Sequence, residues 1–151
     1  MPVPSFTDHG YLPAGDHEVT WQELYDRFGW NEARRELLAN FKVVRDGLES
    51  LKVETIWLNG SFATSKHRPS DIDVIFVPPP GADIAQWGLL SPHQRGHLKQ
   101  RGGIDLWAYP SYAYHGRTSH HQTIKDFMSS DRDGVPKGML LLVQETYLDQ
   151  H

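Results

Sequence analysis

The chain has 151 residues, of which 38% are hydrophobic and 23% charged, as is typical of one globular domain with its own core. Its formal charge of −4 argues against a broad nucleic-acid surface built from dense Lys and Arg, although a small nucleotide could still bind. The absence of cysteine excludes disulfides and thiolate zinc sites, and no apolar run reaches membrane-spanning length. Because the N-terminus lacks a signal-peptide core, we expect a cytoplasmic protein.

The N-terminal third predicts an arm followed by two helices. Residues 1–17 contain three prolines and two glycines without periodicity, which indicates an extended arm. Thr20 and Glu23 form a capping box for a helix over 21–28. Asn31 is the expected cap of a longer helix over 32–51, whose apolar residues predict one buried stripe at helical spacing: Leu37, Leu38, Phe41, Val44 and Leu48.

The basic residues of this longer helix lie mainly off the apolar stripe. They are Arg34, Arg35, Lys42 and Arg45. We expect them on a solvated helix face, with phosphate contact as the alternative.

The stretch 53–77 carries the residues best suited to chemistry. Residues 55–58 are β-branched, aromatic or apolar and predict a strand, which Asn59-Gly60 ends. The next predicted strand opens with Asp71 and Asp73, whose side chains share one face because strand side chains alternate. Two carboxylates on one face repel each other unless a cation lies between them, and oxygen ligands suit a hard ion such as Mg²⁺.

The rest of the chain predicts one more helix, a third strand and a C-terminal helix, loop and strand. A helix over 84–100 is expected after Asp83, with breaks at its Gly and Pro residues, and Gly102-Gly103 ends it. Residues 104–109 then alternate as a strand that places Asp105, Trp107 and Tyr109 on one face. A helix over 118–128 and a strand over 137–145 follow, separated by a loop with strong turn chemistry.

Gly60-Ser61 follows the first strand of the central stretch. Glycine lets a backbone approach a phosphate closely, and free N–H groups at a helix start attract anions. Together with carboxylates for Mg²⁺, such a turn is typical of sites that catalyse phosphoryl or nucleotidyl transfer.

This pattern resembles the signature of the DNA polymerase β-like nucleotidyltransferase superfamily: Gly60-Ser61, then Asp71-Ile72-Asp73 between two strands, with Asp105 as the third acid on a later strand. The resemblance implies an α+β fold in which helices flank a mixed β-sheet. We expect a single domain, 1–151. It comprises the arm over 1–17, a catalytic core over 53–109 and the C-terminal elements over 110–151. Segments near both ends also resemble an uncharacterised bacterial family with this core.

The resemblance further implies a site. Asp71, Asp73 and Asp105 are the expected catalytic and metal-binding residues for Mg²⁺ or Mn²⁺. Gly60 and Ser61 are expected to hold the phosphates of a nucleoside triphosphate. The expected nucleotide is ATP. Lys66 and Arg68 are candidates for the same phosphates, with surface solubility as the competing explanation. The implied reaction moves a nucleoside monophosphate, expected to be AMP, to a hydroxyl on a partner protein or small molecule.

The chain is short for such an enzyme, because only about 40 residues follow the third strand. The acceptor must then come from a partner protein, a second copy or a small molecule. In size the chain resembles the minimal nucleotidyltransferases of bacteria and archaea, some of which are antitoxins that modify a toxin. The alternative is an inactive antitoxin or regulatory module that acts by protein binding.

Histidines and tyrosines in the last third offer weaker signals. His120-His121, with His115 nearby, is read as solvent-facing or capping, since adjacent helical residues point about 100° apart. Tyr109, Tyr112 and Tyr114 are aromatic candidates for stacking a base, with ordinary packing as the favoured role. Asp131 and Asp133 lack the remaining ligands of a calcium loop and predict a turn.

Overall fold

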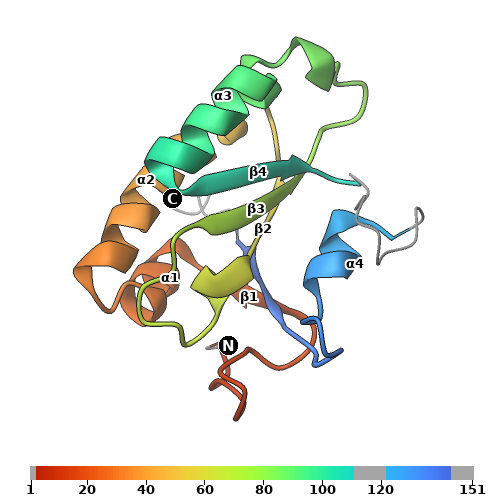
Figure 1. Ribbon diagram of the computed structural model, residues 1–151. Coiled ribbons are helices and arrows are strands. Elements are labelled where there is room, and N and C mark those ends of the chain that lie inside the picture. The colour runs from red at the N-terminus through yellow and green to blue at the C-terminus, as the bar shows by residue number, and fades with distance from the viewer. Residues whose placement is uncertain (1–2, 111–121, 144–151) are drawn as a thin grey trace, which may run out of the picture.

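The computed structural model describes residues 3–110 and 122–143. Its five strands form one mixed sheet in the order β1-β5-β2-β3-β4, and its helices pack against that sheet (Figure 1). The strands are β1 (Asp16–Val19), β2 (Thr55–Asn59), β3 (Ile72–Val77), β4 (Ile104–Ala108) and β5 (Met139–Leu142). Strands β1 and β5 pair in parallel, as do β3 and β4, whereas β2 is antiparallel to both of its neighbours. The predicted α+β fold with a mixed sheet is confirmed.

The first two helices follow from their caps. Helix α1 (Trp21–Phe28) begins after Thr20, whose side chain accepts a hydrogen bond from the backbone N–H of Glu23 at 3.0 Å. Helix α2 (Glu32–Ser50) begins after Asn31, whose Oδ1 accepts from the N–H of Arg34 at 2.9 Å. All members of the predicted apolar stripe of α2 are buried.

The two faces of the sheet have different compositions. Alternation places apolar side chains of every strand on the face that packs against α1 and α2, where they form the main core. The opposite face carries a smaller cluster around Ile75 and Ile124, in which Trp57, Trp107 and Tyr109 are half-buried. Helix α4 (Ile124–Met128) belongs to that second face. Polar chemistry on the sheet is therefore confined to one side.

The segment between β3 and β4 is the least regular part of the described chain. The predicted helix over 84–100 is broken into two short 3-10 turns, η2 (Ile84–Gln86) and η3 (Gly88–Leu90), then α3 (Pro92–His97) and the π-helical turn η4 (Leu98–Gly102). Ser91, not Asp83, supplies the side-chain cap of α3. Gly103 ends the segment in the left-handed conformation, with φ of 68°. Helix α3 and η4 together run along β4 (Figure 1).

The two ends of the chain meet in the sheet. The end of the expected arm forms β1, because Asp16 to Val19 pair with β5. Earlier arm residues pack on the domain: Val3 and Leu12 are buried, and Arg27 donates hydrogen bonds to the carbonyls of Val3 and Pro4. The last strand is shorter than the predicted range 137–145, and α4 begins at Ile124 within the helix expected over 118–128. None of the helices that the structure describes is long and apolar enough to cross a membrane.

Candidate active site

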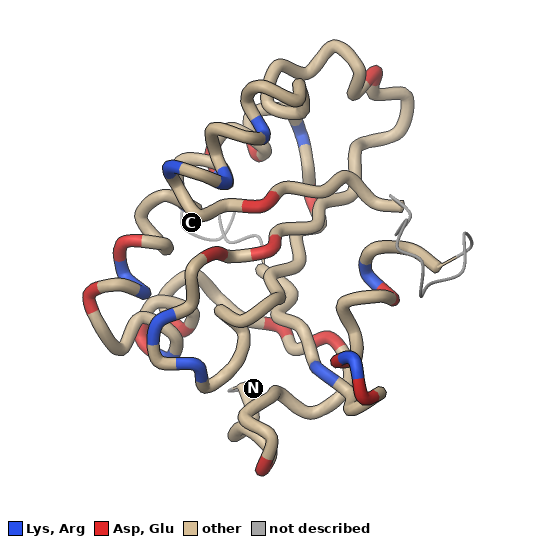
Figure 2. The backbone as a smooth tube through the Cα atoms, in the orientation of Figure 1, with Lys and Arg blue, Asp and Glu red and all other residues tan. Residues whose placement is uncertain are grey.

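The carboxylates predicted from the sequence lie on the polar face of the sheet. Asp73 on β3 is directly opposite Asp105 on the parallel strand β4, and on its other side it is opposite Asn59 on β2. Asp71 precedes β3 by one residue. Figure 2 shows acidic segments on these neighbouring strands and basic segments on the helix that runs along β4. The strand register thus places Asp73 and Asp105 side by side, with Asp71 just before β3.

Burial and the charges of neighbouring carboxylates disfavour ionisation of Asp73 and Asp71. The pKa of Asp73 is raised to about 7 by burial, by the charges of Asp71 and Asp105 and by a hydrogen bond with the Asp105 carboxyl. The pKa of Asp71 is also raised, first by burial and then by the charge of Asp105. The carboxylates therefore interact as one electrostatic unit.

Gly60 is required at this site for two separate reasons. It begins the 3-10 turn η1 (Gly60–Ala63), and its φ of +78° is a conformation that other residues rarely adopt. A Cβ at this position would also overlap Oδ2 of Asp73. The glycine therefore lets the turn lie directly against the Asp73 carboxylate.

The carboxylates of Asp71, Asp73 and Asp105 are chemically suited to a hard divalent cation, but their side chains do not converge on one point. Within residues 3–110 and 122–143, no group of three or more His, Asp or Glu side chains is close enough together to hold an ion. Carboxylate oxygens are nevertheless the ligands that Mg²⁺ prefers. Asn59, opposite Asp73, has a buried Oδ1 without a hydrogen-bond partner among the described residues, so a further oxygen is free in the same row. Asp71, Asp73 and Asp105 are the residues suited to holding such an ion.

Two basic residues that the sequence did not single out face Asp105. Nζ of Lys99 lies 3.5 Å from one carboxylate oxygen of Asp105, and a guanidinium nitrogen of Arg95 lies 3.9 Å from the other. The two cations are four residues apart on the α3–η4 segment, a spacing that brings side chains to one helix face. The four-residue spacing could have indicated from the sequence that the two side chains share a face. The expected breaks in this helix made that indication hard to recognise.

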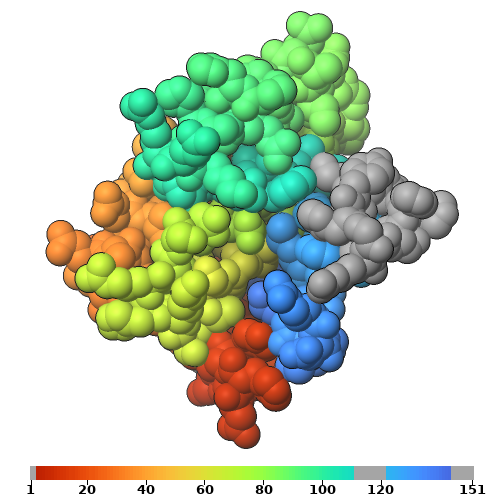
Figure 3. Space-filling view, viewed as in Figure 1, coloured from red at the N-terminus to blue at the C-terminus, as the bar shows by residue number. Residues whose placement is uncertain are grey.

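A polar cavity of about 360 Å³ lies on the other side of the Gly60-Ser61 turn. Its lining includes Ser61 and Lys66, both predicted to contact phosphates, and Lys137, which the sequence did not suggest. Lys66 also lowers the pKa of Asp71 through its charge. Arg68 is exposed on the same loop and does not line the cavity. Figure 3 shows the surface hollowed where the η1 region, the α3–η4 segment and the C-terminal part meet.

The expectation that Arg34 lies on a solvated helix face is wrong. Its side chain is fully buried, and its guanidinium donates hydrogen bonds to the carbonyls of four residues: Phe28, Phe62, Thr64 and Lys66. It also lies over the Trp30 ring, at 3.6 Å from the centroid. Burial lowers its pKa to about 10. Arg34 thus ties α2 to the loop that follows the Gly60-Ser61 turn.

The weaker aromatic and histidine signals have separate outcomes. Tyr109 packs against Trp57, with ring centroids 5.8 Å apart, as the favoured packing role predicts. Tyr112, Tyr114, His115, His120 and His121 lie outside the described residues. Asp131 accepts hydrogen bonds from the N–H groups of Asp133 and Val135, which is the predicted turn.

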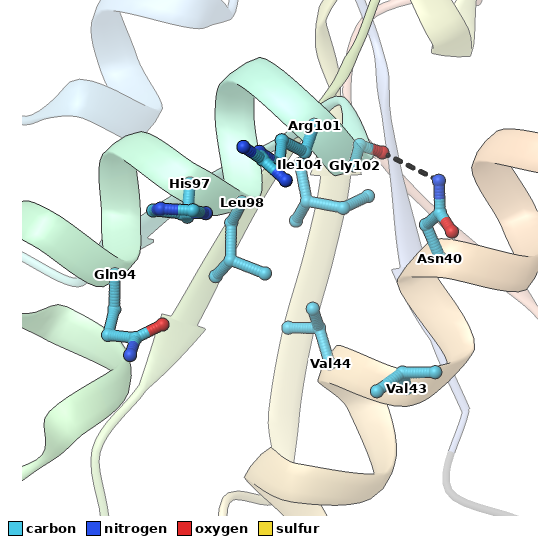
Figure 4. A pocket seen from close by; sticks show the side chains of 9 residues that line it. All are labelled: Asn40, Val43, Val44, Gln94, His97, Leu98, Arg101, Gly102 and Ile104. Atoms are coloured by element: carbon cyan, nitrogen blue, oxygen red, sulfur yellow. Dashed lines mark hydrogen bonds between the residues drawn. The ribbon is translucent and has the colours of Figure 1, made fainter.

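A second surface groove, of about 330 Å³, lies between α2 and the α3–η4 segment (Figure 4). Val43, Val44 and Leu98 point into it, and Nδ2 of Asn40 bridges its upper end by donating to the carbonyl of Gly102 at 3.0 Å. Ile104 lines this groove, whereas its neighbour Asp105 points to the other face of the sheet. The groove is therefore separate from the carboxylate site.

Comparison with known proteins gave one match. Residues 4–143 match the model of a protein family described as a family of unknown function (DUF6932). No curated protein and no solved structure matches the chain.

Proposed function

The chain belongs to DUF6932, a family of unknown function, and we propose from its site that it is a Mg²⁺- or Mn²⁺-dependent nucleotidyltransferase. Its substrate in this proposal is a nucleoside triphosphate, expected to be ATP, and its acceptor is a hydroxyl group on a partner protein or small molecule. The observation that carries the proposal is the cross-strand pair of Asp73 and Asp105, with Asp71 beside it and Gly60 packed against it.

Such a pair is costly for the fold unless it has a task. Burial and neighbouring negative charge raise the pKa values of Asp73 and Asp71 and oppose their ionisation. Proteins keep such arrangements where function uses the charge, so strongly perturbed acids in a hollow are candidates for catalysis. The close approach of a glycine turn to one of these acids supports the same interpretation.

In the proposed reaction, the acceptor oxygen bonds to the α-phosphorus as the bond to the bridging oxygen breaks, and pyrophosphate leaves. A divalent cation supplies charge neutralisation for this transfer. Asp71, Asp73 and Asp105 would hold it, and a carboxylate oxygen of Asp105 would accept the hydroxyl proton. Asp73 must lose its own proton before it can serve as a ligand.

The cavity beyond the Gly60-Ser61 turn is the proposed place for the terminal phosphates. Lys66 and Lys137 bring two positive charges to it, and Ser61, Thr64 and Ser65 bring hydroxyl groups. Phosphates are commonly bound by such combinations of charge and hydrogen-bond donors. In this proposal one triphosphate extends from the acids to Lys66 and Lys137.

The base has candidate partners on the same sheet face. Trp57 on β2 and Trp107 on β4 each lie two residues from the row of Asn59, Asp73 and Asp105, on the same face, and are half-buried. Aromatic rings can stack with any base, so they support nucleotide binding without selecting the nucleotide.

A binding-only module is the second candidate, and one observation favours it. Asp105 already has two cationic neighbours, Lys99 and Arg95, and the carboxylates are not gathered around an ion. A scaffold that kept the fold but bound a partner protein, such as a toxin, would tolerate that arrangement. This second candidate predicts partner binding that survives loss of the carboxylates.

The test uses purified protein with each of the four α-labelled nucleoside triphosphates, in Mg²⁺ and in Mn²⁺, with and without host lysate. The control is the Asp73→Asn/Asp105→Asn variant, with its fold checked by circular dichroism. We expect label on a protein or small molecule in the wild-type reactions and not in the control. No label in any reaction, with no metal-dependent nucleotide binding by calorimetry, would reject the enzyme and favour the binding module.

A further inference from the structure

The α3–η4 segment places two positive charges directly over the carboxylate site. Lys99 and Arg95 each approach a different oxygen of Asp105, at 3.5 Å and 3.9 Å. Charge-assisted hydrogen bonds between such groups are about 2.7–2.9 Å long. Both contacts are thus ion pairs without a closed hydrogen bond, so each cation can leave Asp105 without breaking one.

Lys99 acts on the whole site and not on Asp105 alone. Its charge lowers the pKa values of both Asp71 and Asp73, in opposition to the burial that raises them. The side chain of Lys99 is 56% exposed, whereas that of Asp105 is 15% exposed. The cation therefore reaches in from solvent toward a largely enclosed acid.

Arg95 is held differently, over an aromatic ring. Its guanidinium carbon lies 4.8 Å from the centroid of the Trp107 ring, two residues beyond Asp105 on β4. Its Nε is buried and has no hydrogen-bond partner within the described part of the chain. A buried donor without a partner is costly, so this side chain gains by any move that brings an acceptor to it.

We infer that Lys99 and Arg95 are exchangeable counter-cations: they neutralise Asp105 in the metal-free protein, compete there with a divalent ion, and turn to the phosphates of the nucleotide when the ion binds. The inference rests on the proposed function, since it assigns a role to residues of the same site.

This arrangement couples the two ligands. A divalent ion alone must displace two positive charges from Asp105 without compensating them, so it binds weakly. A nucleotide brings negative phosphates that the displaced cations can pair with, so it strengthens binding of the ion. The coupling is reciprocal, because each ligand changes the affinity of the other by the same factor.

The first measurement uses Mn²⁺ alone, without nucleotide, and follows binding by calorimetry and by electron paramagnetic resonance. We expect Lys99→Gln to bind Mn²⁺ about two- to fivefold more tightly than wild type, the range expected for removing one partly exposed charge. Arg95→Gln should shift affinity in the same direction. Arg101→Gln is the matched control, because Arg101 carries the same charge on η4 but lines the groove of Figure 4.

The second measurement repeats the titration with a non-hydrolysable ATP analogue. In wild type the analogue should raise Mn²⁺ affinity, and in Lys99→Gln this enhancement should shrink. A merely structural lysine would change both titrations in the same direction or neither, with altered thermal unfolding. Equal Mn²⁺ affinity in wild type and Lys99→Gln would overturn the inference, and so would the absence of Mn²⁺ binding in every variant.

These outcomes are independent of the transfer assay. Tighter Mn²⁺ binding by Lys99→Gln without any nucleotidyl transfer would support the counter-cations and reject the enzyme. Nucleotidyl transfer by wild type, with unchanged Mn²⁺ affinity in Lys99→Gln, would support the enzyme and reject the counter-cations.

Discussion

At the scale of single residues, the turn at Gly60 offers a direct comparison. Gly60 and Gly81 both have φ of +78°, but a Cβ at Gly60 would overlap the Asp73 carboxylate, whereas nothing lies within 4 Å of one at Gly81. We expect Gly81→Ala to lower the free energy of unfolding by about 1 kcal/mol through strain alone. Gly60→Ala should cost about 2 kcal/mol more, because the carboxylate has to move.

Urea denaturation of the two variants measures this difference. If the contact with Asp73 causes the extra cost, combining Gly60→Ala with Asp73→Ala should remove most of it. Equal costs for the two glycine variants would mean that the turn relaxes away from the carboxylate without penalty.

The elevated pKa of Asp73 makes stability depend on pH. In the unfolded chain this acid ionises near its usual pKa of 3.8, but in the folded protein the pKa is about 7. Between these values the folded state binds the proton that the unfolded state has lost. The free energy of unfolding therefore falls as pH rises from about 4 to about 7, since the charged form is disfavoured by the fold.

Asp73→Asn should remove this dependence. We expect the variant to be more stable than wild type at pH 8 by about 1–3 kcal/mol and to gain little at pH 4.5. Thermal unfolding of both proteins at the two pH values tests this. A variant that is less stable than wild type at pH 8 would show that Asp73 is structurally required as a carboxylate.

The residues of the site were only partly predictable. Asp71 and Asp73 were grouped because alternation along a strand fixes which side chains share a face, and Asp105 was added from the family resemblance. Arg34 was misjudged because spacing along a helix predicts only the face from which a side chain leaves the backbone. The long arginine side chain can still turn back and bury its guanidinium among carbonyls. Lys99 was missed because breaks in its segment hid its helical spacing from Arg95, and Lys137 was missed because only a tertiary contact brings it to the cavity.

At the scale of elements, Arg34 joins α2 to the loop after η1. Its guanidinium donates hydrogen bonds to four carbonyls. The single ammonium group of a lysine cannot reproduce this set of donors. We expect both Arg34→Met and Arg34→Lys to lower the free energy of unfolding by about 2–4 kcal/mol, because buried carbonyls lose their donors.

Arg35→Met is the matched control for this prediction. Arg35 is exposed and donates to one carbonyl, that of Gly29 at 2.9 Å. Its loss should cost less than about 1 kcal/mol, as is usual for surface substitutions. Similar losses in Arg34→Lys and Arg35→Met, measured by urea denaturation, would contradict the anchoring role of Arg34.

Elements with explicit caps were predicted best. Thr20 and Asn31 start α1 and α2 where the sequence indicates, and the apolar stripe of α2 is buried as its spacing requires. The segment over 84–102 could not be resolved in the same way, since its glycines and proline permit several short turns. Which of those turns form depends on packing against β4.

At the scale of the whole molecule, ligand binding should stabilise the fold. A ligand that binds only the folded state at a hundredfold excess over its dissociation constant adds about 2.7 kcal/mol. We expect Mg²⁺ together with a non-hydrolysable ATP analogue to raise the melting temperature, and neither alone to do so as strongly. Differential scanning fluorimetry with and without each component measures the effect.

The Asp73→Asn/Asp105→Asn variant should show no such combined shift. A shift that persists in this variant would mean that the nucleotide binds elsewhere, for example through Lys66 and Lys137 without the acids.

The mixed character of the sheet was predicted, but its strand order was not. Hydrophobic patterns indicate which segments are strands, whereas pairing between distant strands depends on the folded whole. Thus β5 lies between β1 and β2, which no local pattern in the sequence requires.

This position of β5 has a consequence for synthesis on the ribosome. Strand β1 is made early, but its partner Met139–Leu142 emerges only after nearly all of the described chain. The cavity lined by Ser61 and Lys66 has the same dependence, because His9 and Tyr11 from one end of the chain meet Lys137 from the other. A nascent chain that ends before Lys137 would therefore contain Asp71, Asp73 and Asp105 but only part of the cavity lining, so this cavity is completed last.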